Sequence, residues 1–219
     1  MVDRALRPLK TRVLAPLARP LERTQPAAIT GAGLAVGLAA AAAAAAGWFH
    51  VALAAWIVNR VLDGLDGDVA RRSGRASARG AYLDLMADLV VYAAVPLGLA
   101  AGAVGAGLAD PAAAWGAAAL AGAAFYVNLG SLAFLSSALA SAPENARARS
   151  AGSAPGIHLP AGLIEGAETV VLFAIALALP ALAPWTLGAI GVLVLATAAQ
   201  RVLWGATRLA RGASPGGAS

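Results

Sequence analysis

The chain contains no cysteine and only two histidines, His50 and His158. The absence of cysteine excludes disulfides, thiolate nucleophiles and zinc sites built from cysteine and histidine. Imidazole general-base catalysis would rest on two histidines that are far apart in the sequence. Charged residues are also scarce, at 12% of 219 residues, whereas a soluble domain carries about 25%. Any chemistry must therefore come from carboxylates, arginines, hydroxyls or a bound metal ion.

Apolar residues take the place of the missing charge. They make up 60% of the chain, and the mean hydropathy is +0.74, above the range of soluble or disordered chains. At about 20 residues per membrane-spanning helix, the sequence predicts an all-α polytopic membrane protein whose single domain is a bundle of six transmembrane helices. The predicted spans are residues 27–47, 49–70, 81–105, 112–138, 159–180 and 183–207.

The two ends of the chain differ from this apolar middle. Residues 1–26 combine basic side chains with leucines at helical spacing, and they predict an amphipathic helix lying in the cytosolic interface of the membrane. Residues 27–209 make up the predicted transmembrane domain, in which any catalysis would take place. Residues 210–219 are rich in glycine and serine and are predicted to be disordered.

The basic residues predict the orientation of the bundle. With six spans, all sixteen lysines and arginines fall on one side of the membrane or at its boundary. Because short loops rich in these residues stay cytosolic, both termini are predicted to be cytosolic. The net charge of +5 is thus explained by topology. Nucleic-acid binding is not predicted, since no aromatic residue is interleaved with the arginines.

Acidic residues gather at the predicted cytosolic ends of spans 2 and 3. Five of the eleven lie between positions 63 and 88, although an aspartate at the centre of a span costs about 2.5–3.5 kcal/mol. At about 100° per residue, Asp63 and Asp66 share one helix face. The other residues on that face are Gly67, Ala70 and Arg71.

The next span repeats the pattern, with Asp84 and Asp88 on one face beside Gly80. A short connection predicts that the two helices are antiparallel neighbours with these faces opposed. Asp68 points elsewhere and is predicted to be solvated or paired with a loop arginine. Four opposed carboxylates repel one another unless cations hold them, and oxygen ligands match Mg²⁺ or Mn²⁺. The cluster therefore predicts a site for two divalent cations.

Residues 63–88 also resemble a known signature. They read DGLDGDVAR, eight further residues, then GAYLDLMAD, which is similar to the motif D-x2-D-G-x2-A-R-x8-G-x3-D-x3-D of the CDP-alcohol phosphotransferase family. Every fixed position of the motif is filled. The resemblance implies an integral membrane enzyme with two bound divalent metals, a donor such as CDP-diacylglycerol, an alcohol acceptor and CMP as leaving group.

The resemblance also implies a role for each motif residue. The implied metal ligands are Asp63, Asp66, Asp84 and Asp88. The residues implied to line the nucleotide and diphosphate pocket are Gly67, Ala70, Arg71 and Gly80. Asp88 would in addition accept the proton of the acceptor hydroxyl.

A later segment bears on the acceptor. Residues 162–169 read GLIEGAET and are similar to the E-R-x-E-R segment of the family's phosphatidylinositol-phosphate synthases, with Gly166 and Thr169 in place of the two arginines. This departure argues against an inositol-phosphate acceptor, because arginines there would grip a phosphate. Glu165 and Glu168 remain, and they would orient a neutral polyol, contact a cationic alcohol or brace the bundle.

The residues leave the acceptor and the donor open. Arg147 and Arg149, in the predicted cytosolic loop, would assist a phosphorylated acceptor such as glycerol phosphate. A family member could use a CDP-alcohol head-group donor. The rival outside the family is a divalent-cation carrier, which the apolar outer halves of the spans disfavour.

Small-residue helix faces would permit a homodimer. The predicted location is a bacterial or archaeal inner membrane with a cytosolic active site.

Overall fold

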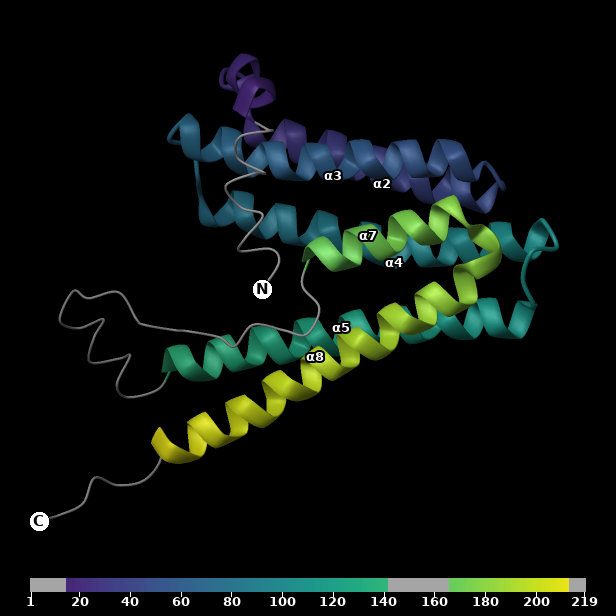
Figure 1. The fold of residues 1–219 in the computed structure, drawn as a ribbon. Coiled ribbons are helices and arrows are strands. Elements are labelled where there is room, and N and C mark those ends of the chain that lie inside the picture. The colour runs from purple at the N-terminus through teal and green to yellow at the C-terminus, as the bar shows by residue number, and fades with distance from the viewer. Residues whose placement is uncertain (1–14, 142–165, 213–219) are drawn as a thin grey trace, which may run out of the picture.

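The computed structural model describes residues 15–141 and 166–212. These two ranges are helical and contain no strand, which confirms the all-α prediction. Residues 15–21 form a short helical segment, and residues 180–182 form a 3-10 turn, η1 (Pro180–Leu182). The α-helices in Figure 1 are α2 (Pro26–Ala45), α3 (Phe49–Arg72), α4 (Ala78–Gly105), α5 (Pro111–Ser141), α7 (Gly166–Ala178) and α8 (Ala183–Gly212).

Four of these segments are long and apolar enough to cross a membrane, as an integral membrane protein requires: α2, α4, α5 and the stretch Pro180–Ala210. Each lies where a span is predicted. The count of six is not confirmed, for two physical reasons. α3 carries the charged motif, which lowers its hydropathy, and α7 has only 13 residues within the described part of the chain.

The described part of the predicted interfacial helix is attached to the bundle. Ala18 is fully buried and packs with Ile29 of α2 and with Leu65 and Val69 of α3. Arg75, in the connection between α3 and α4, donates a hydrogen bond to the backbone carbonyl of Glu22.

At the other end of the chain, α8 continues past residue 209 to Gly212. The remainder of the predicted tail lies outside the described residues.

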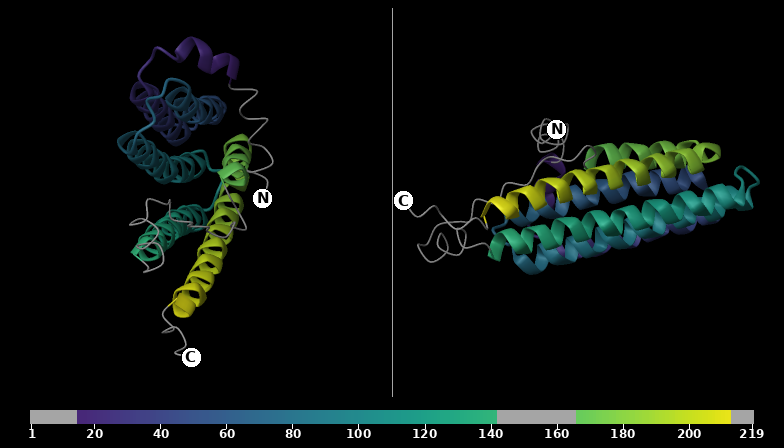
Figure 2. Two further views of the ribbon diagram at one scale, coloured as in Figure 1. Left: turned by 90° about the vertical axis from the view of Figure 1, so that its left-hand side faces the viewer. Right: turned by 90° about the horizontal axis from the view of Figure 1, so that it is seen from below.

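α2, α3, α4 and α5 run along a common direction, and α8 is inclined to them, as the left view of Figure 2 shows. α3 and α4 are antiparallel, but they are not each other's main neighbours, because α2 makes extensive contacts with both. The prediction that α3 and α4 are antiparallel neighbours with opposed faces holds for their side chains, since Arg60 of α3 donates to Asp88 of α4 at 2.9 Å, but the backbone of each helix packs mainly against α2. Small residues are the cause: a Cβ at Gly98 or Gly102 of α4 would collide with backbone carbonyls of α2, so the two backbones approach closely.

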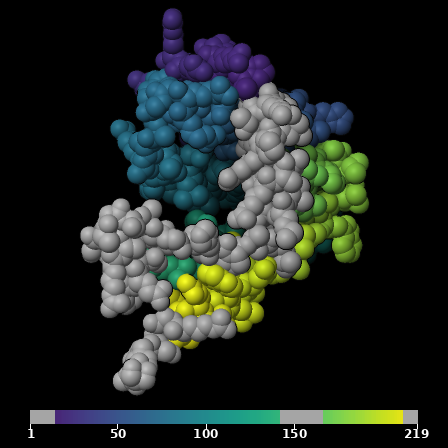
Figure 3. Space-filling view, turned by 60° about the vertical axis from the view of Figure 1, so that its left-hand side comes forward, coloured from purple at the N-terminus to yellow at the C-terminus, as the bar shows by residue number. Residues whose placement is uncertain are grey.

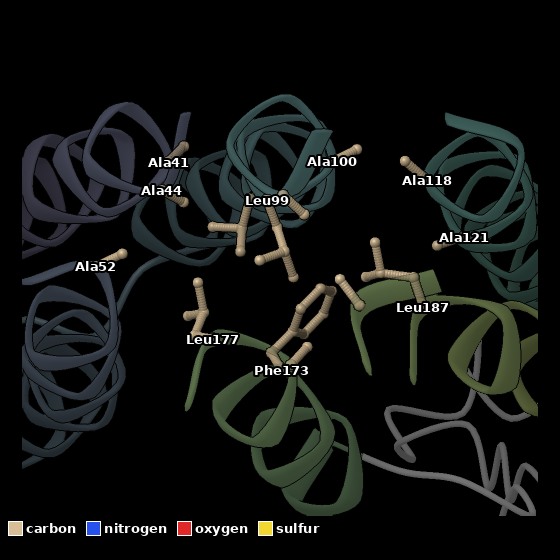
Figure 4. Packing of buried hydrophobic residues seen from close by; sticks show 14 of the residues in the cluster. Ala41, Ala44, Ala52, Leu99, Ala100, Ala118, Ala121, Phe173, Leu177 and Leu187 are labelled. Carbon is tan, nitrogen blue, oxygen red and sulfur yellow. The ribbon is translucent and has the colours of Figure 1, made fainter. Parts of the chain in front are cut away.

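An aromatic core lies next to the acidic end of α3. Trp56 is fully buried, its ring lies 5.2 Å from that of Phe173, and its Nε1 donates to the carbonyl of Val170 at 3.2 Å. Figure 4 shows Phe173 and Leu177 of α7 pointing into the space between the other helices. α7 therefore supports the segment of α3 from which the motif begins.

Candidate active site and metal centre

Two adjoining cavities lie at the end of the bundle where α3 is joined to α4. The outer cavity has a volume of about 550 Å³ and is lined by the start of α2, the last turns of α3, the α3–α4 connection and the start of α4. Figure 3 views the molecule from nearer this side, with the described ends of α3 and α4 in blue to teal. All four residues predicted for the nucleotide and diphosphate line this cavity: Gly67, Ala70, Arg71 and Gly80.

The inner cavity is small and acidic. The predicted metal ligands all line it: Asp63, Asp66, Asp84 and Asp88. Asp66 and Asp84 border the outer cavity as well, so the two spaces share a boundary made of carboxylates. The sequence motif, spread over 26 positions, is thus brought together around one polar space inside an apolar bundle.

Local structure explains how α4 presents its part of the site. The chain reverses after α3 through Gly74, whose φ of +66° is the left-handed conformation that glycine adopts readily. Ser77 then caps α4, and its Oγ accepts a hydrogen bond from the backbone N–H of Gly80 at 3.1 Å. Asp84 follows one turn later and faces the cavity.

Asp66 is held by Thr30, a partner that sequence spacing did not reveal. The Asp66 residue is 4% exposed, and its carboxylate accepts a hydrogen bond of 2.6 Å from Oγ1 of Thr30 on α2. The feature of the sequence that could have indicated this partner is a hydroxyl side chain near the start of an otherwise apolar span. Thr30 lines both cavities, so α2 contributes directly to the site.

Asp63 and Asp88 both pair with the guanidinium of Arg60. Nη2 of Arg60 donates to Oδ1 of Asp88 at 2.9 Å, and Nη1 of Arg60 lies 3.8 Å from Oδ2 of Asp63. Asp68 faces away from this group and is buried, with Nε of Arg72 donating to its Oδ2 at 2.7 Å. Of the two predictions for Asp68, pairing with an arginine is confirmed and solvation is wrong.

The donor chemistry fits Mg²⁺ or Mn²⁺, because four carboxylates border one cavity. Across residues 15–141 and 166–212, however, no three histidine or acidic residues are placed close enough to hold a metal ion as they stand. Two of the four carboxylates have protein partners, since Asp66 accepts from Thr30 and Asp88 accepts from Arg60. Metal binding would require the carboxylates to move closer together.

Only one of the four residues predicted to bind the acceptor alcohol, Glu168, lies within the described part of the chain. Glu168 lies in the first turn of α7, on the helix whose other residues fill the core beneath Trp56. Glu165, Arg147 and Arg149 lie outside the described residues. A role for any of the four in acceptor binding stays a prediction.

The sequence matches a known family over most of its length. The model of the CDP-alcohol phosphatidyltransferase family matches residues 23–204. The chain belongs to the CDP-alcohol phosphatidyltransferase family. The match includes both cavities and runs from just before α2 into α8, so family membership extends well beyond the motif.

A curated relative and two solved structures accompany this match. The inner membrane protein YnjF of Escherichia coli K12 is 40% identical over 100 residues, which cover 45% of this chain and 48% of that protein, or about half of each. The fold resembles phosphatidylinositol phosphate synthase PgsA1 of Mycobacterium tuberculosis with CDP-DAG bound, at a TM-score of 0.67, 23% identity and coverage of 90% and 94%.

The same Mycobacterium tuberculosis enzyme in complex with manganese and citrate gives a TM-score of 0.66 at 23% identity, with 89% of each chain covered. At this level of identity the two structures establish that the fold of this family member is shared. The CDP-DAG and the manganese in those two structures are ligands of that enzyme.

Proposed function

We propose that this protein transfers a phosphatidyl group from CDP-diacylglycerol to the hydroxyl of a small alcohol, with release of CMP, in phospholipid biosynthesis. One observation carries the proposal: the motif residues on α3 and α4 line a cavity of about 550 Å³ that adjoins an acidic inner cavity. A polar headgroup would enter from the cytosolic side, while the acyl chains of the donor stay in the bilayer of a bacterial or archaeal inner membrane.

The outer cavity suits a nucleotide diphosphate. Three arginines line it, Arg71, Arg75 and Arg79, and a guanidinium pairs readily with phosphate oxygens. The absence of a side chain at Gly67 leaves space in the cavity beside Arg71, since a Cβ at Gly67 would lie 3.2 Å from Nη1 of Arg71. A larger residue would press on that side chain and reduce the room for the ligand.

The carboxylates that line the inner cavity suit the transfer step. Asp88 would accept the proton of the alcohol hydroxyl as the alcohol oxygen bonds to the phosphorus that carries diacylglycerol. The bond from that phosphorus to the bridging oxygen breaks, and CMP leaves with the bridging oxygen and its electron pair. Two divalent ions, Mg²⁺ or Mn²⁺, would neutralise the charge on the phosphoryl oxygens when bound. Asp63, Asp66, Asp84 and Asp88 would hold these ions.

The test is an acceptor panel with purified protein, CDP-diacylglycerol and Mg²⁺ or Mn²⁺. CMP release and the lipid product are followed with glycerol phosphate, inositol phosphate, inositol, glycerol, serine and a cationic amino alcohol. A parallel arm with diacylglycerol and a CDP-alcohol tests the head-group donor. No CMP in any arm, under conditions where a known family member turns over, would overturn the proposal.

A matched pair of variants controls this assay. Asp84→Asn removes one proposed metal ligand, whereas Asp110→Asn makes the same substitution at the opposite end of the bundle, where Oδ1 of Asp110 caps α5 by accepting from the N–H of Ala113 at 2.9 Å. CMP release should disappear in the first variant and persist in the second. Equal activity of the two variants would remove the acidic cavity from the mechanism.

A further inference from the structure

Arg60 contacts the carboxylates of the site but has no part in the proposed mechanism. It lies on α3 one turn before Asp63, outside the family motif, and its side chain is only 10% exposed. A guanidinium inside an apolar bundle is costly unless it is paired. Its pairing therefore bears directly on how the site works.

Two motif carboxylates neutralise this guanidinium. Asp88 accepts from Nη2 at 2.9 Å, and Asp63 lies 3.8 Å from Nη1. These are the first and the last aspartates of the motif, and they lie on different helices. Arg60 thus links α3 to α4 through oxygens that the proposed function assigns to metal ions.

A second set of contacts holds Arg60 without any carboxylate. Nε and Nη2 donate to Oδ1 of Asn59 at 2.8 and 2.6 Å. Asn59 is itself fixed, since its Nδ2 donates to the carbonyl of Gly33 at 2.8 Å. The guanidinium also lies 4.8 Å from the ring centroid of Trp56 and 5.2 Å from that of Tyr92, within the range of cation–π attraction. All of these partners are neutral.

A divalent ion held by Asp63 and Asp88 would bind the same two carboxylates with which Arg60 pairs. It would repel a guanidinium that donates to the same carboxylate, because both are cations. We propose that Arg60 is an internal counter-ion that competes with divalent metal for Asp63 and Asp88. When metal binds, Arg60 gives up the carboxylates and stays on Asn59 and the two aromatic rings.

This inference rests on the proposed function, from which it takes the metal requirement, and it predicts an unusual direction of effect. Removing a residue that merely braces the site would loosen metal binding. Removing a competing cation tightens it. Arg60 would thereby offset part of the negative charge of the acidic cavity before metal binds and would set the metal concentration at which the site fills.

The experiment measures Mn²⁺ binding to purified full-length protein in detergent from the electron paramagnetic resonance signal of free Mn²⁺. Arg60→Met should bind Mn²⁺ about tenfold more tightly than the unmodified protein, because a unit charge next to the site is gone. Its melting temperature without metal should fall, and its gain on adding Mn²⁺ should be larger. Arg201→Met is the matched control, since Arg201 donates to the neutral side chains of Asn128 and Ser131, and its Mn²⁺ affinity should not change.

Arg60→Lys keeps the test decisive if Arg60→Met fails to fold. An ammonium group keeps the charge but lacks the planar fork that reaches Asn59 and Asp88 together. Its Mn²⁺ affinity should fall between those of the unmodified protein and Arg60→Met. Unchanged or weaker Mn²⁺ binding in the folded Arg60 variants would overturn the inference.

The two levels of proposal fail in different ways. If the unmodified protein binds no Mn²⁺ and Asp84→Asn behaves identically, the metal requirement of the proposed function falls, and the Arg60 inference falls with it. If the unmodified protein binds Mn²⁺ and Asp84→Asn weakens that binding while the Arg60 variants leave it unchanged, only the Arg60 inference is wrong.

Discussion

Arg60 and Arg201 both lie within apolar helices, and their surroundings differ in a way that separates the two halves of the bundle. Arg60 faces the carboxylates of Asp63 and Asp88. Arg201, on α8, donates from Nη1 to the backbone carbonyl and Oδ1 of Asn128 and to Oγ of Ser131, and its buried Nε has no hydrogen-bond partner among the described residues. The α2–α3–α4 unit thus holds charge of both signs, whereas Arg201 joins α8 to α5 through neutral groups.

The different surroundings of the two arginines indicate which half of the bundle performs chemistry and which half mainly provides packing. Charge of both signs in a low-dielectric interior is retained where it performs chemistry or is closely paired. An arginine held by an amide and a hydroxyl links two helices without a reactive group. The α2–α3–α4 unit is therefore the catalytic half of our proposal, and α5 and α8 are its support.

The largest expected effect comes from Asp88→Asn. The amide cannot accept the proton of the alcohol, so kcat for CMP release should fall by about 10³-fold or more. The variant should remain folded, since the amide oxygen still accepts from Arg60. Turnover at saturating metal and donor is measured beside Asp110→Asn. Near-normal rates would remove Asp88 from its assigned role as base.

The next largest effect is expected from a substitution that disturbs the packing of the catalytic half. Gly102→Ala should lower the free energy of unfolding by about 1–3 kcal/mol, because its Cβ would meet the carbonyl oxygen of Ala44 on α2. Thermal unfolding in detergent measures the effect. Gly188→Ala on α8, where a Cβ meets nothing within 4 Å, is the control and should leave the melting temperature unchanged or slightly raised, because alanine favours the helix more than glycine does.

The support half gives a weaker response to the same type of change. A Cβ at Gly191 of α8 would lie 2.7 Å from Cγ of Leu120 and 3.2 Å from two backbone atoms of α5, whereas a Cβ at Gly102 would overlap a backbone carbonyl oxygen of α2 much more severely. Gly191→Ala should therefore destabilise the protein less than Gly102→Ala. Equal losses in the two variants would contradict the view that α2 and α4 are the more tightly constrained pair.

Glu168→Gln tests whether α7 belongs to the catalytic half. If Glu168 contacts the acceptor and does not merely brace the bundle, the acceptor KM should rise about tenfold, the size of a lost charged hydrogen bond. The KM for CDP-diacylglycerol and the melting temperature should stay constant. A loss of stability with an unchanged acceptor KM would instead make Glu168 a bracing residue.

The smallest effect on activity is expected from Arg201→Met. The hydrogen bonds to Asn128 and Ser131 are lost, which should cost about 1–3 kcal/mol of stability, whereas kcat should change by less than about twofold. Thermal unfolding and CMP release are measured on the same preparation. A selective loss of turnover without a loss of stability would place chemistry in the α5–α8 half as well.

Much of the site follows from local sequence. Helical periodicity places Asp63, Asp66 and Gly67 on one face, and the structure brings that face to the cavity. The position of Asp68 away from the cavity follows from the same periodicity. These relations depend only on spacing along one helix, which tertiary packing leaves intact.

Some contacts depend on how the helices pack and could not be read from spacing. Thr30 reaches Asp66 across 36 positions of sequence, because α2 packs against both α3 and α4. The hydrogen bond between Arg60 and Asp88 joins residues 28 positions apart. A lone threonine or arginine inside a span has many available partners, and only the packing selects one.

The sequence by itself determined that this is a helical membrane protein with an acidic motif, because hydropathy and helical spacing are local properties of the chain. Tertiary structure alone decided which cation meets those carboxylates. Close packing of α2 against α4 at Gly98 and Gly102 orders the helices, and that order directs Thr30 to Asp66 and Arg60 to Asp88. The physical reason is that pairing in a low-dielectric interior depends on distances of a few ångströms, which arise from contacts between segments far apart in the sequence.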